Sequence, residues 1–330
     1  MQKVIYEAMV EKAKALLENG TVDRVLGWRR GQFGYDVTPS TFNCASDIEK
    51  NFVYSCFSGA NLSKYLVKET VKPGKVLVFL KPCDSYSFNQ LLTEHRFDRE
   101  KVYAVGVPCE GTADAEKLKA CAGEGIVGAC DNGDTVSVTT LYNGEIIIPF
   151  EQIVCERCTV CKSKRCVAYD ELIGENGTEE ASLRFDRVAE LEAMTEDERF
   201  EFWQGELSRC IRCNACRDVC PACTCEKCVF DNPKSPLENK APADSFEEKM
   251  FHIIRAFHVA GRCTDCGECS RVCPQNIPLH LLNRKFIKDI NEFYSDYQAG
   301  EAVGARSPVV DYTTEDIEPS EAVQKGEGNA

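Results

Sequence analysis

Two stretches with the same pattern decide the fold: Arg209–Pro221 reads RCIRCNACRDVCP, and Arg262–Pro274 reads RCTDCGECSRVCP. Each contains C-x2-C-x2-C-x3-C-P, the spacing with which a chain holds two [4Fe–4S] clusters. Three cysteines two residues apart wrap one face of a cluster, and the fourth continues to the other cluster. We therefore expect one cluster to take Cys210, Cys213, Cys216 and Cys273, and the other to take Cys263, Cys266, Cys269 and Cys220.

A third cysteine set precedes the repeat. Its first three members again have cluster spacing, and four residues separate the last two: the set is Cys155, Cys158, Cys161 and Cys166. This pattern predicts a third [4Fe–4S] cluster, whose fourth ligand is local or comes from elsewhere in the chain. Zinc and unligated thiols are the alternatives for this set, although zinc sites usually separate their C-x2-C pairs by longer loops.

Three more cysteines, Cys223, Cys225 and Cys228, follow the first half of the repeat in the segment PACTCEKC. Three interpretations stay open for these cysteines. They bind a fourth cluster, they bind a mononuclear metal, or they are structural thiols without a metal. The six remaining cysteines are not at ligand spacing, but each is a candidate for the fourth ligand of that cluster: they are Cys44, Cys56, Cys83, Cys109, Cys121 and Cys130. Two of them, Cys83 and Cys109, follow a proline just after a predicted strand, at the edge of the sheet where α/β domains place ligands.

Length and composition narrow the class of protein. The chain has 330 residues and a net charge of −14, from 39 basic and 53 acidic residues. This excess of acid argues against nucleic acid as the main partner, because phosphate binding needs clustered Lys and Arg. No apolar run is long enough to predict a membrane span, and the first residues read as an amphipathic helix rather than a signal peptide. We expect a cytoplasmic protein, in which closely spaced cysteines indicate metal rather than disulfides.

The first 150 residues predict an α/β domain. The apolar runs 75–80 and 101–107 read as strands buried on both faces, and helical segments at 2–19 and 83–92 alternate with them. Residues 135–141 and 145–148 flank Asn143–Gly144 and predict a hairpin. Residues 151–180 are a cysteine-rich cluster segment.

Residues 181–296 predict an α-helical ferredoxin-like dicluster domain, so that the whole chain is α+β. Thr195 and Ser245 begin capping-box patterns, and a last helix is expected over 278–295. From 297 to 330 the chain is rich in Gly, Ala, Glu and Pro, which predicts a disordered, acidic, flexible tail.

Residues 20–178 resemble the beta subunits of the coenzyme F420-type (deazaflavin) hydrogenases and formate dehydrogenases. The resemblance is carried by YSCFSGANLSKY at 54–65, VLVFLKPC at 76–83, VGVPC at 105–109, and Cys155-x2-Cys158 followed by YDELIGENG at 169–177. The chain is thus similar to that family fused to a bacterial-type dicluster ferredoxin module, and to iron–sulfur subunits associated with heterodisulfide-reductase-like complexes. The resemblance implies FAD as a further cofactor, for which Ser58, Asn61 and Lys64 are candidates.

These observations lead to one main hypothesis and two alternatives. The main one is a non-catalytic iron–sulfur subunit of an anaerobic, hetero-oligomeric oxidoreductase (a hydrogenase, formate dehydrogenase or heterodisulfide-reductase-like complex), which relays single electrons between flavin or catalytic subunits. The first alternative is a flavin-bearing subunit that exchanges hydride with a soluble carrier, a deazaflavin or NAD(P), and feeds the clusters. The second is a zinc-rich scaffold without a redox role.

Overall fold

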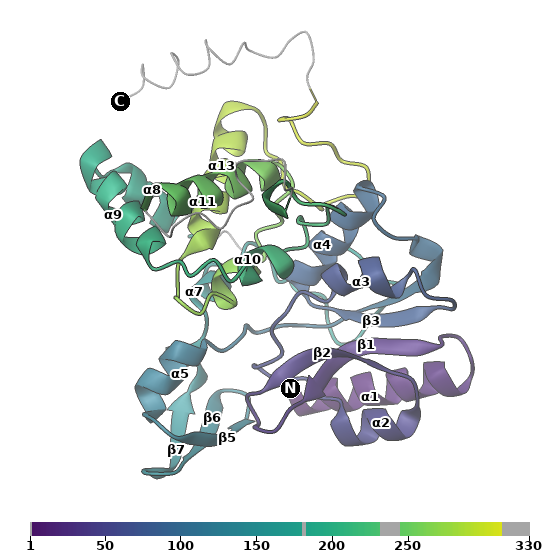
Figure 1. Ribbon diagram of the computed structural model, residues 1–330. Coiled ribbons are helices and arrows are strands. Elements are labelled where there is room, and N and C mark those ends of the chain that lie inside the picture. The colour runs from purple at the N-terminus through teal and green to yellow at the C-terminus, as the bar shows by residue number, and fades with distance from the viewer. Residues whose placement is uncertain (1, 180–182, 232–244, 312–330) are drawn as a thin grey trace.

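The computed structural model describes residues 2–179, 183–231 and 245–311 of the chain. They form an α/β region, a small second sheet and a helical region that carries the repeat (Figure 1). Within this described part, no helix is both long and apolar enough to cross a bilayer.

The α/β region is built on a five-stranded sheet in the order β2-β1-β3-β4-β8. Its strands are β1 (Arg24–Arg30), β2 (Val37–Phe42), β3 (Val76–Leu80), β4 (Val102–Gly106) and β8 (Glu171–Leu172). Strands β1, β3, β4 and β8 are parallel, and β2 pairs antiparallel with β1 at one edge. Since β8 pairs with β4, this sheet extends past residue 150 into the cysteine-rich segment.

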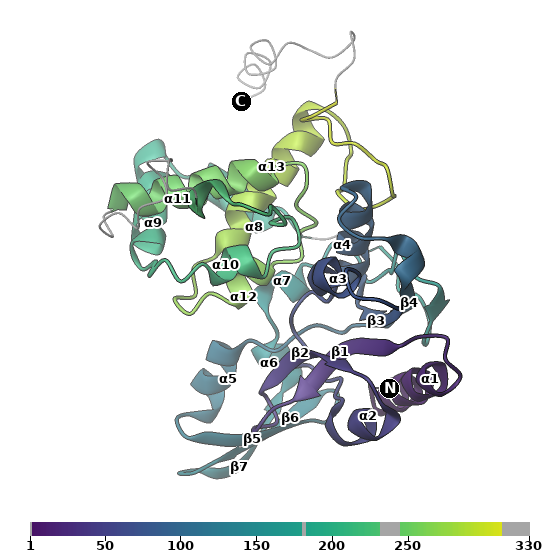
Figure 2. The ribbon, with the colours of Figure 1, turned by 45° about the vertical axis from the view of Figure 1, so that its right-hand side comes forward.

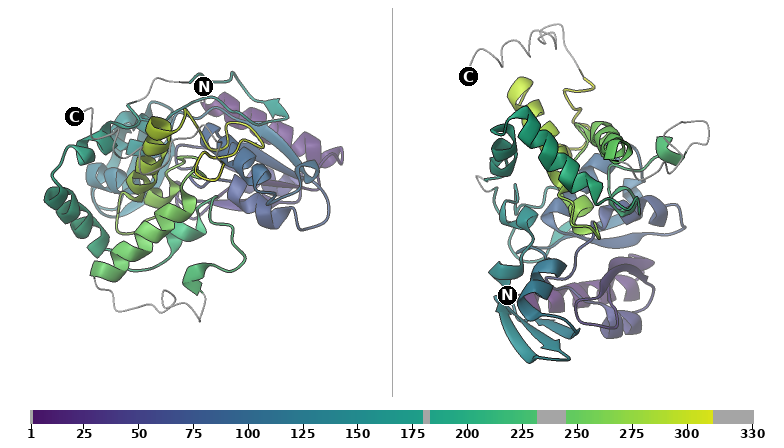
Figure 3. Two further views of the ribbon diagram at one scale, coloured as in Figure 1. Left: turned by 90° about the horizontal axis from the view of Figure 1, so that it is seen from above. Right: turned by 60° about the vertical axis from the view of Figure 1, so that its left-hand side comes forward.

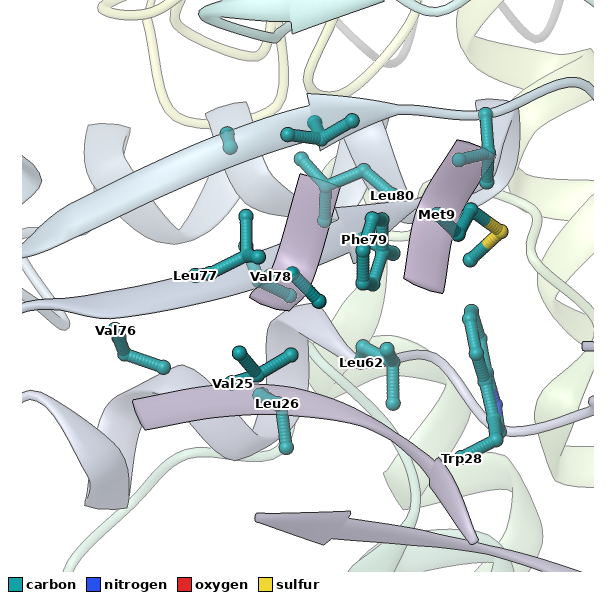
Figure 4. Packing of buried hydrophobic residues seen from close by; sticks show 14 of the residues in the cluster. Met9, Val25, Leu26, Trp28, Leu62, Val76, Leu77, Val78, Phe79 and Leu80 are labelled. Carbon is teal, nitrogen blue, oxygen red and sulfur yellow. The ribbon is translucent and has the colours of Figure 1, made fainter. Parts of the chain in front are cut away.

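Helices cover both faces of this sheet. Helices α1 (Gln2–Glu18) and α2 (Ala45–Asn51) lie on one side, and α3 (Ser63–Glu69) and α4 (Pro82–Thr93) lie on the other (Figure 2). A strand enclosed on both faces needs an apolar side chain at every position. All five residues of β3 are fully buried, and they pack against Met9, Trp28 and Leu62 from neighbouring elements (Figure 4).

A separate three-stranded antiparallel sheet is formed by the part of the chain that connects β4 to β8. It consists of β5 (Ile126–Asp131), β6 (Thr135–Thr140) and β7 (Gly144–Pro149), and it packs against α5 (Ala115–Ala122) and α6 (Phe150–Ile153). The predicted hairpin is confirmed as β6 and β7, with Gly144 at a positive φ of 70° in the turn. This sheet lies at the end of the molecule away from the C-terminal helices (Figure 3).

The helical region holds α8 (Asp186–Glu192), α9 (Glu196–Ser208), α11 (Ser245–Val259) and α13 (Leu279–Phe293). The predicted capping box is present at α9: the Thr195 hydroxyl accepts from the Glu198 amide, and the Glu198 carboxylate accepts from the Thr195 amide. Between these long helices lie the short helices α10 (Ala215–Asp218), α12 (Glu268–Arg271) and η2 (Val229–Asp231), while α7 (Glu156–Thr159) lies in the cysteine-rich segment.

The prediction of a flexible tail from residue 297 is wrong for residues 297–311. Gln298, Ala299 and Ser307 are buried, and Gly300 lies so close to the Tyr86 carbonyl oxygen that an added Cβ would be only 1.9 Å from it. Glu301 also pairs with Arg165. Small residues and hydrogen bonds, rather than large apolar side chains, hold this stretch against α4. Residues 312–330 of the predicted tail lie outside the described residues.

Candidate metal centre

The two halves of the repeat have the same backbone geometry. Arg212 and Asn214 have positive φ angles of 53° and 62°, and the residues that match them in the second half, Asp265 and Gly267, have 57° and 67°. L-residues rarely adopt such angles. Each pair flanks the second cysteine of its motif, so the backbone reverses on both sides of that residue. The two loops therefore present their cysteines in the same way.

The short helices α10 and α12 then carry the third cysteine of each half, Cys216 and Cys269, and both side chains are buried. In each half the fourth cysteine follows the short helix. The chain runs on from there, which leaves the fourth thiol free to reach across to the other half.

Thiols from the two halves meet across the domain. Cys273 of the second half lines the same cavity as the first three cysteines of the first half, Cys210, Cys213 and Cys216. Cys220 of the first half lies close enough to Cys263, Cys266 and Cys269 to raise their thiol pKa values, in addition to the larger effect of burial. An exchange of fourth ligands requires this proximity, and the exchange itself stays a prediction.

Nitrogen donors surround these thiols. Arg255 on α11 is buried and donates to the Cys216 carbonyl oxygen at 3.0 Å, and its charge lowers the pKa values of Cys216 and Cys269 against the larger effect of burial. The Asn283 amide donates to the Cys269 sulfur at 3.7 Å, and the Arg212 backbone N–H donates to the Cys210 sulfur at 3.4 Å. Hydrogen bonds and positive charge next to sulfur favour the anionic, metal-binding state of a thiol.

The third set lies at the carboxyl ends of β3 and β4. The Thr112 hydroxyl lies 3.6 Å from the sulfur of Cys155 and 3.5 Å from that of Cys158. Cys166 is buried, and its thiol donates to the carbonyl oxygens of Leu80 and Val107 at 3.6 and 3.8 Å.

Two cysteines that were not assigned to this set, Cys83 and Cys109, lie beside it. Cys109 is close to Cys158, and burial together with that neighbour raises the pKa of Cys109 to about 11. Cys83 is close to Cys109 and Cys161, and burial raises its pKa. The Pro-Cys pair after each of two adjacent parallel strands indicates this edge of the sheet, because such strand ends meet there, but it does not indicate that the third set lies beside them.

The structure does not bring Cys223, Cys225 and Cys228 into one group. Cys223 packs with Cys220 and Cys263, Cys228 packs with the apolar cluster around Phe230, and Cys225 is exposed. Among the described residues, no group of three or more His, Cys, Asp or Glu side chains is arranged to hold a single metal ion.

A buried ionic network links the third set to the repeat. Arg157 lies between Cys155 and Cys158 in the sequence, donates to the Thr112 hydroxyl at 2.8 Å, and pairs with Glu268 at 3.1 Å. Burial alone would raise the Glu268 pKa, but Arg271 and Arg157 lower it to about 2, so that Glu268 is ionised. Because Arg157 also donates to the Cys266 carbonyl oxygen, the two cysteine regions are held together through one guanidinium.

A cavity of about 560 Å³ opens beside this network. Residues 112–118, residues 155–157 and residues 270–274 line it, so that it reaches Cys155 on one wall and Cys273 on another. The flavin candidates do not line it. Ser58 and Asn61 are buried, and their side chains are hydrogen-bonded within the α/β region. Lys64 donates to the Cys223 carbonyl oxygen.

Comparison with known proteins places the repeat in a described family. Residues 206–277 match the model of the 4Fe-4S dicluster domain. A protein of Sinorhizobium fredii named as a ferredoxin-3 is 33% identical over 73 residues, which make up 22% of this chain and 70% of that protein.

Two longer relatives match most of the chain. The F420-dependent formate dehydrogenase subunit beta of Methanocaldococcus jannaschii is 22% identical, over 83% of this chain and 87% of that protein. The F420-dependent formate dehydrogenase 1 subunit beta of Methanococcus maripaludis is 24% identical, over 89% and 92%. The expected resemblance to that family of beta subunits is confirmed.

Among solved structures, a chain of the F420-reducing [NiFe] hydrogenase complex from Methanosarcina barkeri is 14% identical, with a TM-score of 0.38 over 64% of this chain and 91% of that one. A score of this size does not establish a shared fold.

Proposed function

We propose that this chain, which belongs through residues 206–277 to the 4Fe-4S dicluster proteins, relays single electrons as the iron–sulfur subunit of a multi-subunit oxidoreductase of the F420-dependent formate dehydrogenase or hydrogenase class. The observation that supports this proposal most directly is that Cys273 lies beside the cysteines of the first half and Cys220 lies beside those of the second half. Its partners are then catalytic subunits of that complex.

The chain's own residues fit two [4Fe–4S] groups. In this proposal the eight cysteines of the repeat form two sets of four, and the left-handed residues of both loops orient them. Bound clusters of this type accept and donate one electron at a time. The apolar packing around Cys216 and Cys269 excludes water, and Arg255 supplies positive charge between the sets. Burial, charge and hydrogen bonding are the features by which a protein sets a cluster's potential.

For the third set we propose that the fourth ligand is Cys109 rather than Cys166. Support comes from the position of Cys109 beside Cys158 and from the hydrogen bonds of the Cys166 thiol to two strand-end carbonyls. Cys109→Ser is therefore expected to lower the iron content by about four atoms per chain. Iron and sulfide are measured on protein purified without oxygen.

Two matched variants control that experiment. Cys121→Ser changes an exposed cysteine on α5 and is expected to keep all iron. Cys166→Ser is expected to keep it as well. Loss of the iron in Cys166→Ser with full iron in Cys109→Ser would contradict this assignment and restore the local ligand set.

The cavity beside Arg157 favours a second candidate function, in which the chain also binds a flavin. Its volume lies in the range of small-molecule sites, and its walls include one predicted ligand from each of two clusters. A flavin there would let the chain exchange electron pairs with a soluble carrier and single electrons with the clusters. Lys117, Arg157 and Arg271 line this cavity and offer positive charge to a phosphate.

Denaturing the chain, purified alone and without oxygen, separates the two candidates. Release of about one yellow, fluorescent flavin per chain is expected if the cavity serves this role. A full iron content without released flavin would contradict the flavin-binding function and leave the electron relay as the remaining candidate.

A further inference from the structure

His252 has no hydrogen-bond partner among the described residues, although it is buried. It lies on α11, which packs against α9 and α13 (Figure 2), and only 2% of its surface is exposed. Both ring nitrogens, Nδ1 and Nε2, are buried and unpaired. Buried polar groups are nearly always hydrogen-bonded, so an orphaned imidazole requires an explanation.

The imidazole lines the cavity that also contains Cys210, Cys213, Cys216 and Cys273. Phe251 packs edge-on to the His252 ring, with ring centroids 5.0 Å apart and an interplanar angle of 82°, and this contact holds the orientation of the ring. The charged groups that act on His252 are Arg255 and Arg212, neither of which can accept a hydrogen bond. The acceptors that line the cavity are sulfur atoms, backbone carbonyls and the side-chain amide oxygens of Asn214 and Gln275, and neither amide is hydrogen-bonded to the imidazole.

We propose that His252 donates a hydrogen bond from a ring nitrogen to a sulfur of the cluster held by Cys210, Cys213, Cys216 and Cys273, and that it thereby raises the reduction potential of that cluster. An imidazole carries at least one N–H donor in either protonation state. The donor stabilises the reduced cluster more than the oxidised one, because the reduced cluster carries more negative charge on its sulfur. This inference rests on the proposed function, and in it His252 is a hydrogen-bond donor to the cluster rather than one of its ligands.

The second set of the repeat has a different donor. There Asn283 donates to the Cys269 sulfur. An amide on one side and an imidazole on the other give the two clusters different surroundings. The difference provides a physical means to separate their potentials and to give electron transfer a direction.

The test compares His252→Leu with His252→Gln in the full chain, purified without oxygen and titrated with dithionite while the EPR signals are recorded. His252→Leu is expected to keep its iron and to shift the potential of one cluster to a more negative value, leaving the others unchanged. His252→Gln keeps an N–H donor and is expected to retain most of the original potential. His258→Leu, an exposed residue on the same helix, is the matched control and should not shift it.

A spectroscopic readout separates hydrogen bonding from packing. Exchange into deuterated buffer is expected to alter a proton coupling of the reduced cluster in wild type, and that coupling should be absent in His252→Leu. Full iron with an unchanged potential in His252→Leu would overturn the proposal while leaving the cluster sets intact. Loss of about four irons in both position-252 variants would also overturn it, because His252 would then be a ligand or part of the fold. Absence of iron from wild type would instead contradict the proposed function.

Discussion

Replacing Cys213 and Cys220 together with serine is expected to remove about eight irons per chain, whereas replacing Cys213 and Cys273 together is expected to remove only about four. Both pairs remove two thiols, but only Cys213 and Cys273 line the same cavity. Cys220 lies instead with the second-half set, close to Cys263. Replacing two ligands of one cluster removes no more iron than replacing one of them, whereas replacing ligands of different clusters removes the iron of both.

Iron and acid-labile sulfide in oxygen-free preparations measure this effect. The single variants Cys213→Ser, Cys220→Ser and Cys273→Ser complete the comparison, and each is expected to lose about four irons. The exposed Cys44→Ser variant controls for the loss of a thiol as such. If Cys213→Ser with Cys220→Ser lost only four irons while Cys213→Ser with Cys273→Ser lost eight, each half would hold its own cluster and the exchanged ligand sets would be wrong.

Asp265→Asn is expected to destabilise the helical region by about 3–5 kcal/mol, because it leaves two buried guanidiniums without a counter-charge. The Asp265 side chain is only 4% exposed, accepts from Arg184 Nε at 2.7 Å, and accepts from Arg284 Nε at 3.1 Å. Burial alone would raise its pKa, but Arg284 and Arg184 lower it to about 2, so that the group is charged. Asparagine tolerates the positive φ of 57° at this position, so the substitution removes the charge with little backbone cost.

Thermal unfolding of oxygen-free protein, followed by circular dichroism, measures the change. The control is Glu190→Gln, which breaks the exposed pair with Arg187 and is expected to leave the transition nearly unchanged. An Asp265→Asn protein as stable as the control would show that Arg184 and Arg284 find other partners. Iron content measured on the same samples shows whether cluster loss contributes.

Elements with strong local signals could be predicted from sequence. β3 is a continuous apolar run, α9 has a capping box, and the hairpin has Asn143–Gly144 at its turn. The elements that were missed carry weak signals. β2 contains Pro39, and half of its residues are polar, which an edge strand tolerates because one side of it makes no ladder hydrogen bonds. β8 has two residues, too few for any periodicity.

The cysteines of the metal centre also fall into those that could be predicted from sequence and those that could not. The repeat predicts its eight cysteines because cluster spacing is local to each half. Cys83 and Cys109 join the third set only through the parallel pairing of β3 and β4, which places two distant segments side by side. The Pro-Cys pairs indicate the sheet edge, but no local pattern indicates that the third set lies against that edge. The packed stretch 297–311 was missed for a related reason, since small residues such as Ala299 and Gly300 gain their contacts from α4 rather than from their own periodicity.

The most direct measurement for the central claim is an iron, sulfide and zinc analysis of the chain purified without oxygen, with EPR spectra recorded after reduction by dithionite. We predict a brown protein with at least about eight irons and eight sulfides per chain, and low-temperature signals of reduced [4Fe–4S] clusters. A colourless protein that contains zinc and gives no paramagnetic signal after reduction would contradict the claim that this chain relays electrons.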